Sequence, residues 1–161
     1  MKPEEIYETL VNKFGETVQG FDTELVGDPS ILIAPSAIAD VCQYLVETDT
    51  LRFDSLMCLS GVDLGVKEEV FSIVYHLHSI SHRHNVVLKA SVPKTDAYLP
   101  TVSHIWKTAD WHERETYDLY GILFEGHTDL RRILLPDDWE GYPLRKDYQE
   151  PDFYRGMRVP Y

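Results

Sequence analysis

Cysteine is scarce in this sequence, and its scarcity excludes several kinds of metal centre. The 161 residues include only two cysteines, Cys42 and Cys58, which are too far apart to form a Cys-x-x-Cys motif. Iron–sulfur clusters and structural zinc sites draw several thiolates from closely spaced cysteines. We therefore expect no cluster and no structural zinc in this chain, and two free thiols fit a reducing cytosol.

The sequence also lacks long hydrophobic runs and a surplus of basic residues. No apolar stretch approaches the roughly 20 residues that a helix needs to cross a bilayer, so we expect no direct membrane span. The first residues, MKPEEIYETLVNKFG, are polar and acidic, unlike a signal peptide. Fifteen lysines and arginines against 27 acidic residues give a net charge of −12. This charge argues against nucleic acid, or an anionic membrane surface, as a direct partner.

Motifs for nucleotide binding and nucleophilic catalysis are absent as well: there is no GxGxxG, phosphate-binding loop or GxSxG. The segment HERET begins like the zinc motif HExxH, but Thr116 stands where the second histidine is required. A second cluster consists of His76, His78, His82 and His84, which flank a predicted hairpin loop. Because no acid or thiol lies in this loop, we interpret these histidines as half-exposed hairpin residues. We predict no catalytic, cofactor-binding or metal site.

Hydrophobic residues are 43% of the chain and charged residues 26%, and their periodicity predicts an α+β fold. A first helix begins at Pro3 and a second at Pro35. The order α-β-β-α-β-β-β fits a two-layer α/β domain with a mixed sheet and its helices on one face. A short helix near VSHIW and a C-terminal helix from about Ala109 to Tyr120 should follow, and then an extended arm. The predicted strands are TVQGFDTELV, SILIA, RFDSLMCLSGV, EVFSIVYHLHS and HNVVLKASV.

The last part of the chain differs in character from the rest. Residues 123–161 show little helical or strand periodicity, yet they carry seven aromatic residues, four prolines and five of the eight arginines of the chain. Disordered segments are poor in aromatics, whereas interfaces are rich in Arg, Tyr and Trp. We therefore predict a small α/β domain at 1–122, which includes the ERE helix, and an extended arm at 123–161 that docks on another subunit. An arm wrapped around its own domain is the alternative.

The predicted helix over WHERETYDLY is dense in charge. Asp110 and Asp118 stand four residues before and after Arg114, so we expect Arg114 to be flanked by both carboxylates. Arg145 and Lys146 are expected to supply counter-charges to Glu113 or Glu115. Interleaved aromatic residues indicate that this network is partly buried, where an unpaired charge would be costly. The pattern favours a docking or bracing element over a catalytic one.

The stretch ERETYDLYGILFEGHTDLRRILLPDDWEGYPLRKDY resembles the signature of the respiratory complex I thirty-kilodalton subunit family, also called the C subunit family. Tyr120 stands where phenylalanine is more usual. The chain ends soon after the signature, which is typical of free-standing bacterial-type or plastid-type subunits. We expect the interface or structural residues to be Glu113, Arg114, Glu115, Asp118, His127, Arg132, Trp139, Tyr142, Arg145 and Lys146.

The resemblance implies a cofactor-free structural subunit in the hydrophilic arm of an NADH–quinone oxidoreductase. Its partners would be the large, hydrogenase-like subunit that forms the quinone site and other hydrophilic-arm subunits. It would lie peripherally on the cytoplasmic side of the membrane, or on the equivalent side in a plastid or mitochondrion. NADH, flavin, iron–sulfur clusters and quinone would be bound by other subunits.

Two alternatives stay open at this point. The chain could be the homologous subunit of a membrane-bound hydrogenase or of a ferredoxin-driven complex, because the electron donor binds elsewhere. A more remote alternative is a stand-alone metal-dependent hydrolase that uses the clustered histidines and Glu113.

Overall fold

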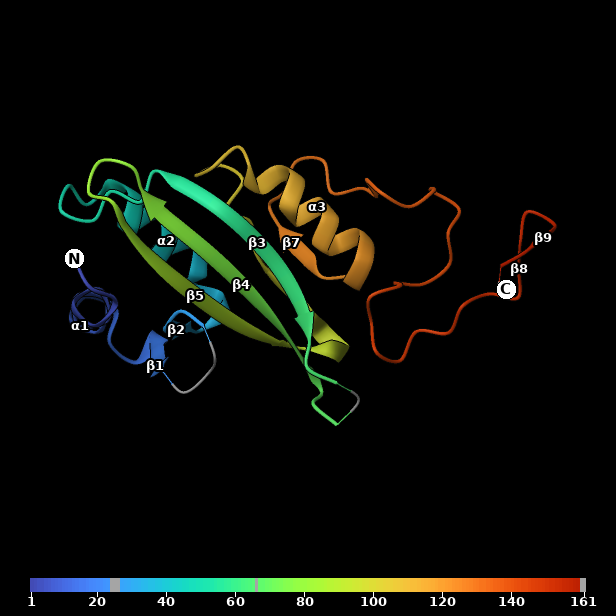
Figure 1. The fold of residues 1–161 in the computed structure, drawn as a ribbon, viewed down its shortest axis with the longest axis horizontal. Helices are drawn as coiled ribbons and strands as arrows, with labels where there is room; N and C mark the ends of the chain where they lie inside the picture. The colour runs from blue at the N-terminus through green and yellow to red at the C-terminus, as the bar shows by residue number, and fades with distance from the viewer. Residues whose placement is uncertain (24–26, 66, 160–161) are drawn as a thin grey trace.

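The computed structural model describes residues 1–23, 27–65 and 67–159, and its helices form where the sequence predicts them (Figure 1). The first helix has a proline in its first turn, and Glu4 and Glu5 lie near its positive amino-terminal end. The helices are α1 (Pro3–Phe14), α2 (Ile38–Glu47) and α3 (Ala109–Tyr120), and 3-10 turns occupy Gly15–Thr17, Pro35–Ala37 and Lys94–Asp96.

The main sheet has five strands in the order β1-β2-β5-β4-β3. Strand β2 runs parallel to β5, and every other neighbouring pair is antiparallel, so the sheet is mixed as predicted. In the long β4–β5 pair, Tyr75 lies opposite Leu88 and Ile73 opposite Ala90. The strands are β1 (Val18–Asp22), β2 (Ser30–Ile33), β3 (Ser55–Asp63), β4 (Val70–Ser79) and β5 (His84–Pro93).

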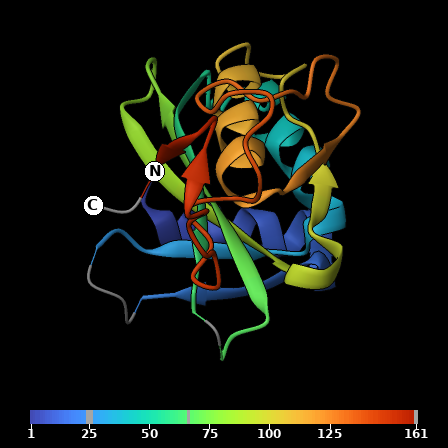
Figure 2. The ribbon, with the colours of Figure 1, turned by 90° about the vertical axis from the view of Figure 1, so that its right-hand side faces the viewer.

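One hydrophobic core joins the helices to one face of the sheet. Strand β4 alternates, and its Phe71, Ile73, Tyr75 and Leu77 are fully buried. Figure 1 shows α2 behind β3, β4 and β5, and in Figure 2 α2 and α3 lie on the same side of these strands. The predicted two-layer α+β architecture, with the order α-β-β-α-β-β-β, is confirmed. Both helices before α3 contribute to this core, through Ile6, Leu10, Val41 and Leu45.

Two local predictions differ from the structure. The segment VSHIW forms turns instead of a helix. The backbone N–H groups of Ile105 and Trp106 both donate to the carbonyl of Val102, but no run of helical hydrogen bonds follows in the described residues before α3. The predicted strand TVQGFDTELV is shorter, since β1 ends at Asp22, and residues 24–26 lie outside the described residues. A short parallel pair of strands, β6 (Tyr98–Pro100) and β7 (Leu123–Glu125), was not predicted.

Strand β7 fastens the start of the arm to the domain. Phe124 in β7 is buried in the core beside Ile122. Beyond it the chain runs without long regular elements to a small hairpin far from the sheet, as Figure 1 shows. Within the described residues, no helix is long and apolar enough to cross a bilayer. The hairpin consists of β8 (Phe153–Tyr154) and β9 (Met157–Arg158).

Candidate functional site at the junction of α3 and the arm

Helix α3 presents several charged residues to the protein interior. Glu113 and Asp118 are completely buried and Arg114 is 8% exposed, whereas Trp111 is 62% exposed. The helix ends at Gly121, whose φ of 71° lies in the left-handed region that favours glycine. A Cβ at this position would lie 2.5 Å from the ring of Tyr142. Glycine therefore allows the arm to pass close to the end of α3.

Asp118 is the main anchor of the arm. Its Oδ2 accepts hydrogen bonds from the backbone N–H groups of Ile133, Leu134 and Leu135 at 3.0, 2.7 and 2.9 Å. Its Oδ1 forms an ion pair with Nη1 of Arg132 at 2.8 Å. Burial alone would raise the pKa of this carboxyl, but the hydrogen bonds and Arg132 hold that pKa below its ordinary value. The ionised carboxylate thus fixes four successive residues of the arm.

Arg132 extends this anchor further along the arm. Its Nη2 donates to the carbonyl oxygens of Trp139 and Gly141 at 3.0 and 3.1 Å. Its guanidinium lies 5.3 Å from the ring centroid of Tyr142. One side chain therefore connects helix α3 with two separate parts of the arm.

Arg114 does not have the partners that helical spacing predicts. Its Nε and Nη2 donate to the backbone carbonyls of Arg131 and Arg132, each at 3.3 Å, and its guanidinium stacks on Trp111. In the described part of the chain, neither expected carboxylate lies within ion-pair distance of Arg114. The prediction was wrong because Asp118 binds Arg132 and Asp110 lies beside His127. Arg114 still holds the arm, but through its backbone.

Glu113 joins α3 to the segment before the helix. Its Oε2 accepts from the Thr101 hydroxyl at 2.5 Å and its Oε1 from the Val102 N–H at 2.7 Å. Burial raises the pKa of this carboxyl to about 7, although the two hydrogen bonds oppose the shift. Arg145 and Lys146 were expected as counter-charges for Glu113 or Glu115, but neither forms an ion pair with them in the described residues. Arg145 donates to the carbonyl of Tyr120, Lys146 contacts Asp63 through its backbone N–H, and Glu115 is exposed.

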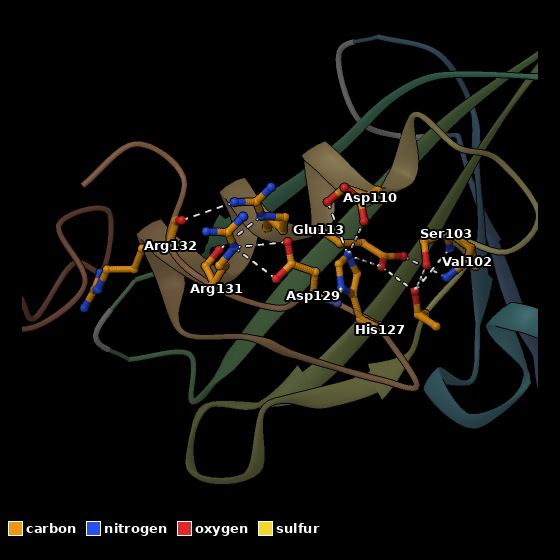
Figure 3. A network of polar contacts seen from close by, with 10 residues as sticks. Val102, Ser103, Asp110, Glu113, His127, Asp129, Arg131 and Arg132 are labelled. Atoms are coloured by element: carbon orange, nitrogen blue, oxygen red, sulfur yellow. Dashed lines mark hydrogen bonds and ion pairs between the residues drawn. The ribbon is translucent and has the colours of Figure 1, made fainter. Parts of the chain in front are cut away.

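His127 lies between Asp110 and Glu113, in the turn that opens the arm (Figure 3). Its Nε2 is 3.3 Å from Oδ1 of Asp110 and 3.8 Å from Oε2 of Glu113. Its Nδ1 accepts from the backbone N–H of Asp129 at 3.0 Å. Since an acceptor nitrogen carries no proton, this contact assigns the proton of the neutral ring to Nε2, which donates to the backbone carbonyl of Asp110 at 3.3 Å.

A second carboxylate, Asp63, pins the arm to the far end of β3. Its Oδ2 accepts from the backbone N–H of Lys146 at 2.9 Å, and its Oδ1 binds Nζ of Lys94 at 2.6 Å. Arg145 donates from Nε to the carbonyl of Tyr120 and stacks on Tyr142, 4.6 Å from the ring centroid. Sequence analysis missed Asp63, because 83 residues separate it from Lys146 and no local pattern relates them.

The distal arm is braced by its own aromatic residues. Trp139 donates from Nε1 to the hydroxyl of Tyr148 at 3.1 Å, and its ring lies 5.0 Å from that of Tyr154. Asp138 accepts from the Tyr154 hydroxyl and from Arg155 at the hairpin. These contacts explain how a segment without periodicity keeps a defined path.

Of the four clustered histidines, His82 and His84 stack with ring centroids 5.5 Å apart. His82 and His84 bind different backbone carbonyls, of Asp49 and Leu51, each at 2.7 Å, while His78 binds the side chain of Asn85. No group of three or more histidine, cysteine or acidic side chains in residues 1–23, 27–65 and 67–159 is placed to hold a metal ion.

The junction leaves apolar side chains of the arm facing solvent. The arrangement brings Glu113, Arg114, Asp118, His127 and Arg132 together around α3. Such a site holds an extended segment in place. The exposed apolar residues of the arm are Leu134, Leu144, Phe153 and Met157, with exposed fractions of 63%, 47%, 65% and 65%.

Comparison with known sequences gives a consistent result. The profile of the family described as "Respiratory-chain NADH dehydrogenase, 30 Kd subunit" matches residues 31–154. The C subunit of the NADH-quinone oxidoreductase of Chloroherpeton thalassium is 44% identical over 156 residues, which cover 96% of this chain and 64% of that protein. The corresponding C subunit of Chlorobium phaeobacteroides is 41% identical over 156 residues and is covered to 93% of its length.

Two solved structures resemble this fold. The trypsin-resistant fragment (1-134) of Nqo5 superimposes with a TM-score of 0.65 and 27% identity, and the match covers 81% of this chain and 100% of the fragment. A chain of the membrane-bound sulfane sulfur reductase, an archaeal respiratory membrane complex, superimposes with a TM-score of 0.74 and 26% identity. That match covers 91% of this chain and 85% of the other.

Proposed function

This chain belongs to the respiratory-chain NADH dehydrogenase 30 Kd subunit family, and we propose that it is a structural subunit in the hydrophilic arm of an NADH–quinone oxidoreductase. In this proposal it carries no cofactor of its own. It packs peripherally on the large, hydrogenase-like subunit that forms the quinone site, on the cytoplasmic side of the membrane or its equivalent. NADH, flavin, iron–sulfur clusters and quinone are bound by other subunits.

The arm is the observation that carries this proposal. Its backbone is fixed to α3 and β3 by two buried carboxylates, Asp118 and Asp63, while Leu134, Leu144, Phe153 and Met157 remain exposed to solvent. An arm that is already ordered loses little conformational entropy when a partner covers it. The structural relative Nqo5 was solved as a trypsin-resistant fragment (1-134), which supports a division into a compact domain and a more accessible end.

A related complex is the second candidate. The match to a chain of the membrane-bound sulfane sulfur reductase shows that this fold occurs in a respiratory membrane complex with different chemistry. The same docking geometry would serve a hydrogenase-type or ferredoxin-driven complex, because in this proposal the chain supplies structure and not the electron donor. The metal-dependent hydrolase has no comparable support in the described residues.

Affinity purification tests the proposed function. A tag at the amino terminus leaves the arm free, and the tagged chain is purified from detergent-solubilised membranes of the native host. We expect the large quinone-site-forming subunit and the NADH-oxidising subunits to co-purify. Hydrogenase or ferredoxin-dependent subunits in their place would favour the second candidate. Recovery of the tagged chain without any respiratory subunit would contradict the proposal.

A further inference from the structure

We propose that Glu113 and Thr101 form a buried proton-binding site, which exchanges its proton with solvent through Ser103 and a hollow beside Asp110. The inference goes beyond the structural role proposed above and does not depend on it. Its starting point is Glu113, whose side chain is completely buried and whose Oε2 lies 3.8 Å from Nε2 of His127. In the part of the chain that the structure describes, no lysine or arginine lies within ion-pair distance of its carboxyl group.

The hydrogen bonds around Glu113 form a chain of hydroxyl groups that leads outward. Thr101 Oγ1 binds Oε2 of Glu113 at 2.5 Å and lies 2.8 Å from Oγ of Ser103. The backbone N–H of Ser103 also donates to Thr101 Oγ1, at 3.1 Å. Each hydroxyl can donate or accept, so the chain can point in either direction.

Protonation reverses the direction of this chain without moving a heavy atom. With Glu113 ionised, Ser103 donates to Thr101 and Thr101 donates to the carboxylate. A proton that arrives at Oγ of Ser103 displaces the original proton of this hydroxyl to Thr101, and the proton of Thr101 passes to Glu113. One proton enters, one carboxylate becomes a carboxylic acid, and both hydroxyls then donate outward.

The route to solvent is short. A surface hollow lies at the outer end of the chain, and Ser103 forms part of its wall. Asp110, whose side chain is 33% exposed, lies in the same wall and contacts His127. The hollow is lined by Ser103, His104, Lys107, Asp110, Gly126 and Thr128.

His127 is held by backbone groups on both sides of its ring. Its Nδ1 accepts the N–H of Asp129 at 3.0 Å, and its Nε2 lies 3.3 Å from the backbone carbonyl oxygen of Asp110. Figure 3 shows the ring beside Asp110 and Glu113, with Nε2 3.3 Å from Oδ1 of Asp110 and 3.8 Å from Oε2 of Glu113. Because no lysine or arginine in the described residues lies within ion-pair distance of Glu113, a proton on Glu113 itself neutralises the buried carboxylate.

The other titratable groups near Glu113 favour the same outcome. Cys42 of α2 and Tyr75 of β4 lie on the core side, and burial raises the pKa of each far above neutrality, so both stay uncharged. The charge of Asp110 on α3 raises the pKa of Glu113, in addition to burial. The pKa of about 7 for Glu113 agrees with a site that is part occupied at neutral pH.

The site can be tested directly in the full-length protein by ¹³C NMR of glutamate carboxyl groups during a pH titration. We expect one resonance with a midpoint near 7 that is missing in Glu113→Gln and retained in Glu115→Gln, an exposed neighbour on the same helix. Thr101→Val removes a hydrogen bond to the ionised form, so the midpoint should rise. Ser103→Ala keeps that bond and should leave the midpoint close to the wild-type value.

Stability against pH gives a second test in the same variants. Because the folded-state pKa is raised from 4.5 to about 7, the folded protein binds a proton that the unfolded chain releases. The proton on Glu113 therefore stabilises the folded state fully below pH 4.5. This stabilisation declines as the pH rises from 4.5 to about 7 and is absent at higher pH. Glu113→Gln should remove this decline and Glu115→Gln should keep it. A Glu113 midpoint near that of ordinary glutamate, or an unchanged midpoint in Thr101→Val, would overturn the proposal.

Discussion

Replacing Asp118 with alanine is expected to lower the free energy of unfolding by roughly 3–5 kcal/mol, the cost of leaving a buried charge without its partner. The substitution leaves Arg132, whose side chain is 15% exposed, without its carboxylate. It also leaves three backbone N–H groups of the arm without an acceptor. Urea denaturation measures the loss, and trypsin digestion shows whether the arm is released.

Asp129 offers a matched control for this substitution. It also forms an ion pair with an arginine of the arm, Arg131, but both side chains are largely exposed, at 51% and 70%. Exposed pairs contribute little, so Asp129→Ala should leave stability nearly unchanged. Because hydrogen bonds and Arg132 lower the pKa of Asp118, its contribution should be lost as the pH falls below the ordinary value of 3.8. Equal stability of the two variants would contradict the role of Asp118.

Removing residues 149–161 should leave a folded protein that binds its partner on the order of tenfold more weakly, or worse, because exposed apolar anchors are lost. This truncation deletes Phe153, Met157 and the ring contact of Tyr154 with Trp139. It keeps the contacts of Asp118 and Asp63 and the hydrogen bond from Trp139 to Tyr148. Removing residues 136–161 also deletes Tyr142, Arg145 and Lys146, so it should reduce stability as well as binding. Co-purification of the large subunit measures binding, and circular dichroism measures folding.

Phe153→Ala gives the sharpest single-residue version of this experiment, with Met57→Ala as its control. Both side chains are well exposed, at 65% and 59%, but Met57 lies in β3 and Phe153 lies in the hairpin of the arm. Only the first substitution should weaken co-purification. If the shorter truncation retained normal binding, the sheet domain would have to make the decisive contact.

The fold was largely predictable because its elements follow simple periodicities. Helix α3 was predicted with its observed bounds, since its charged residues follow helical spacing and Gly121 is a residue suited to a left-handed helix end. The strands β3, β4 and β5 alternate strongly enough to be recognised. The pair β6 and β7 was missed because strands of three residues show no usable period, and each is held by a partner far along the chain.

The partners of the charged residues could not be predicted in the same way. Helical spacing relates Arg114 only to residues of its own helix, whereas the groups that it binds lie 17 and 18 residues further on. Helical spacing predicted that Asp118 pairs with Arg114, but Asp118 accepts from three backbone N–H groups of an irregular segment. Burial decides these pairings, and burial depends on the tertiary path of the arm.

Site-specific photo-cross-linking tests the central claim, that the arm docks this chain on the large quinone-site-forming subunit. A photoreactive phenylalanine analogue is placed at position 153, in the arm, or at position 57, in β3, and the native complex is irradiated before denaturing electrophoresis. We predict a cross-link from position 153 to the large subunit and none from position 57. A cross-link to that subunit from position 57 alone would contradict the account.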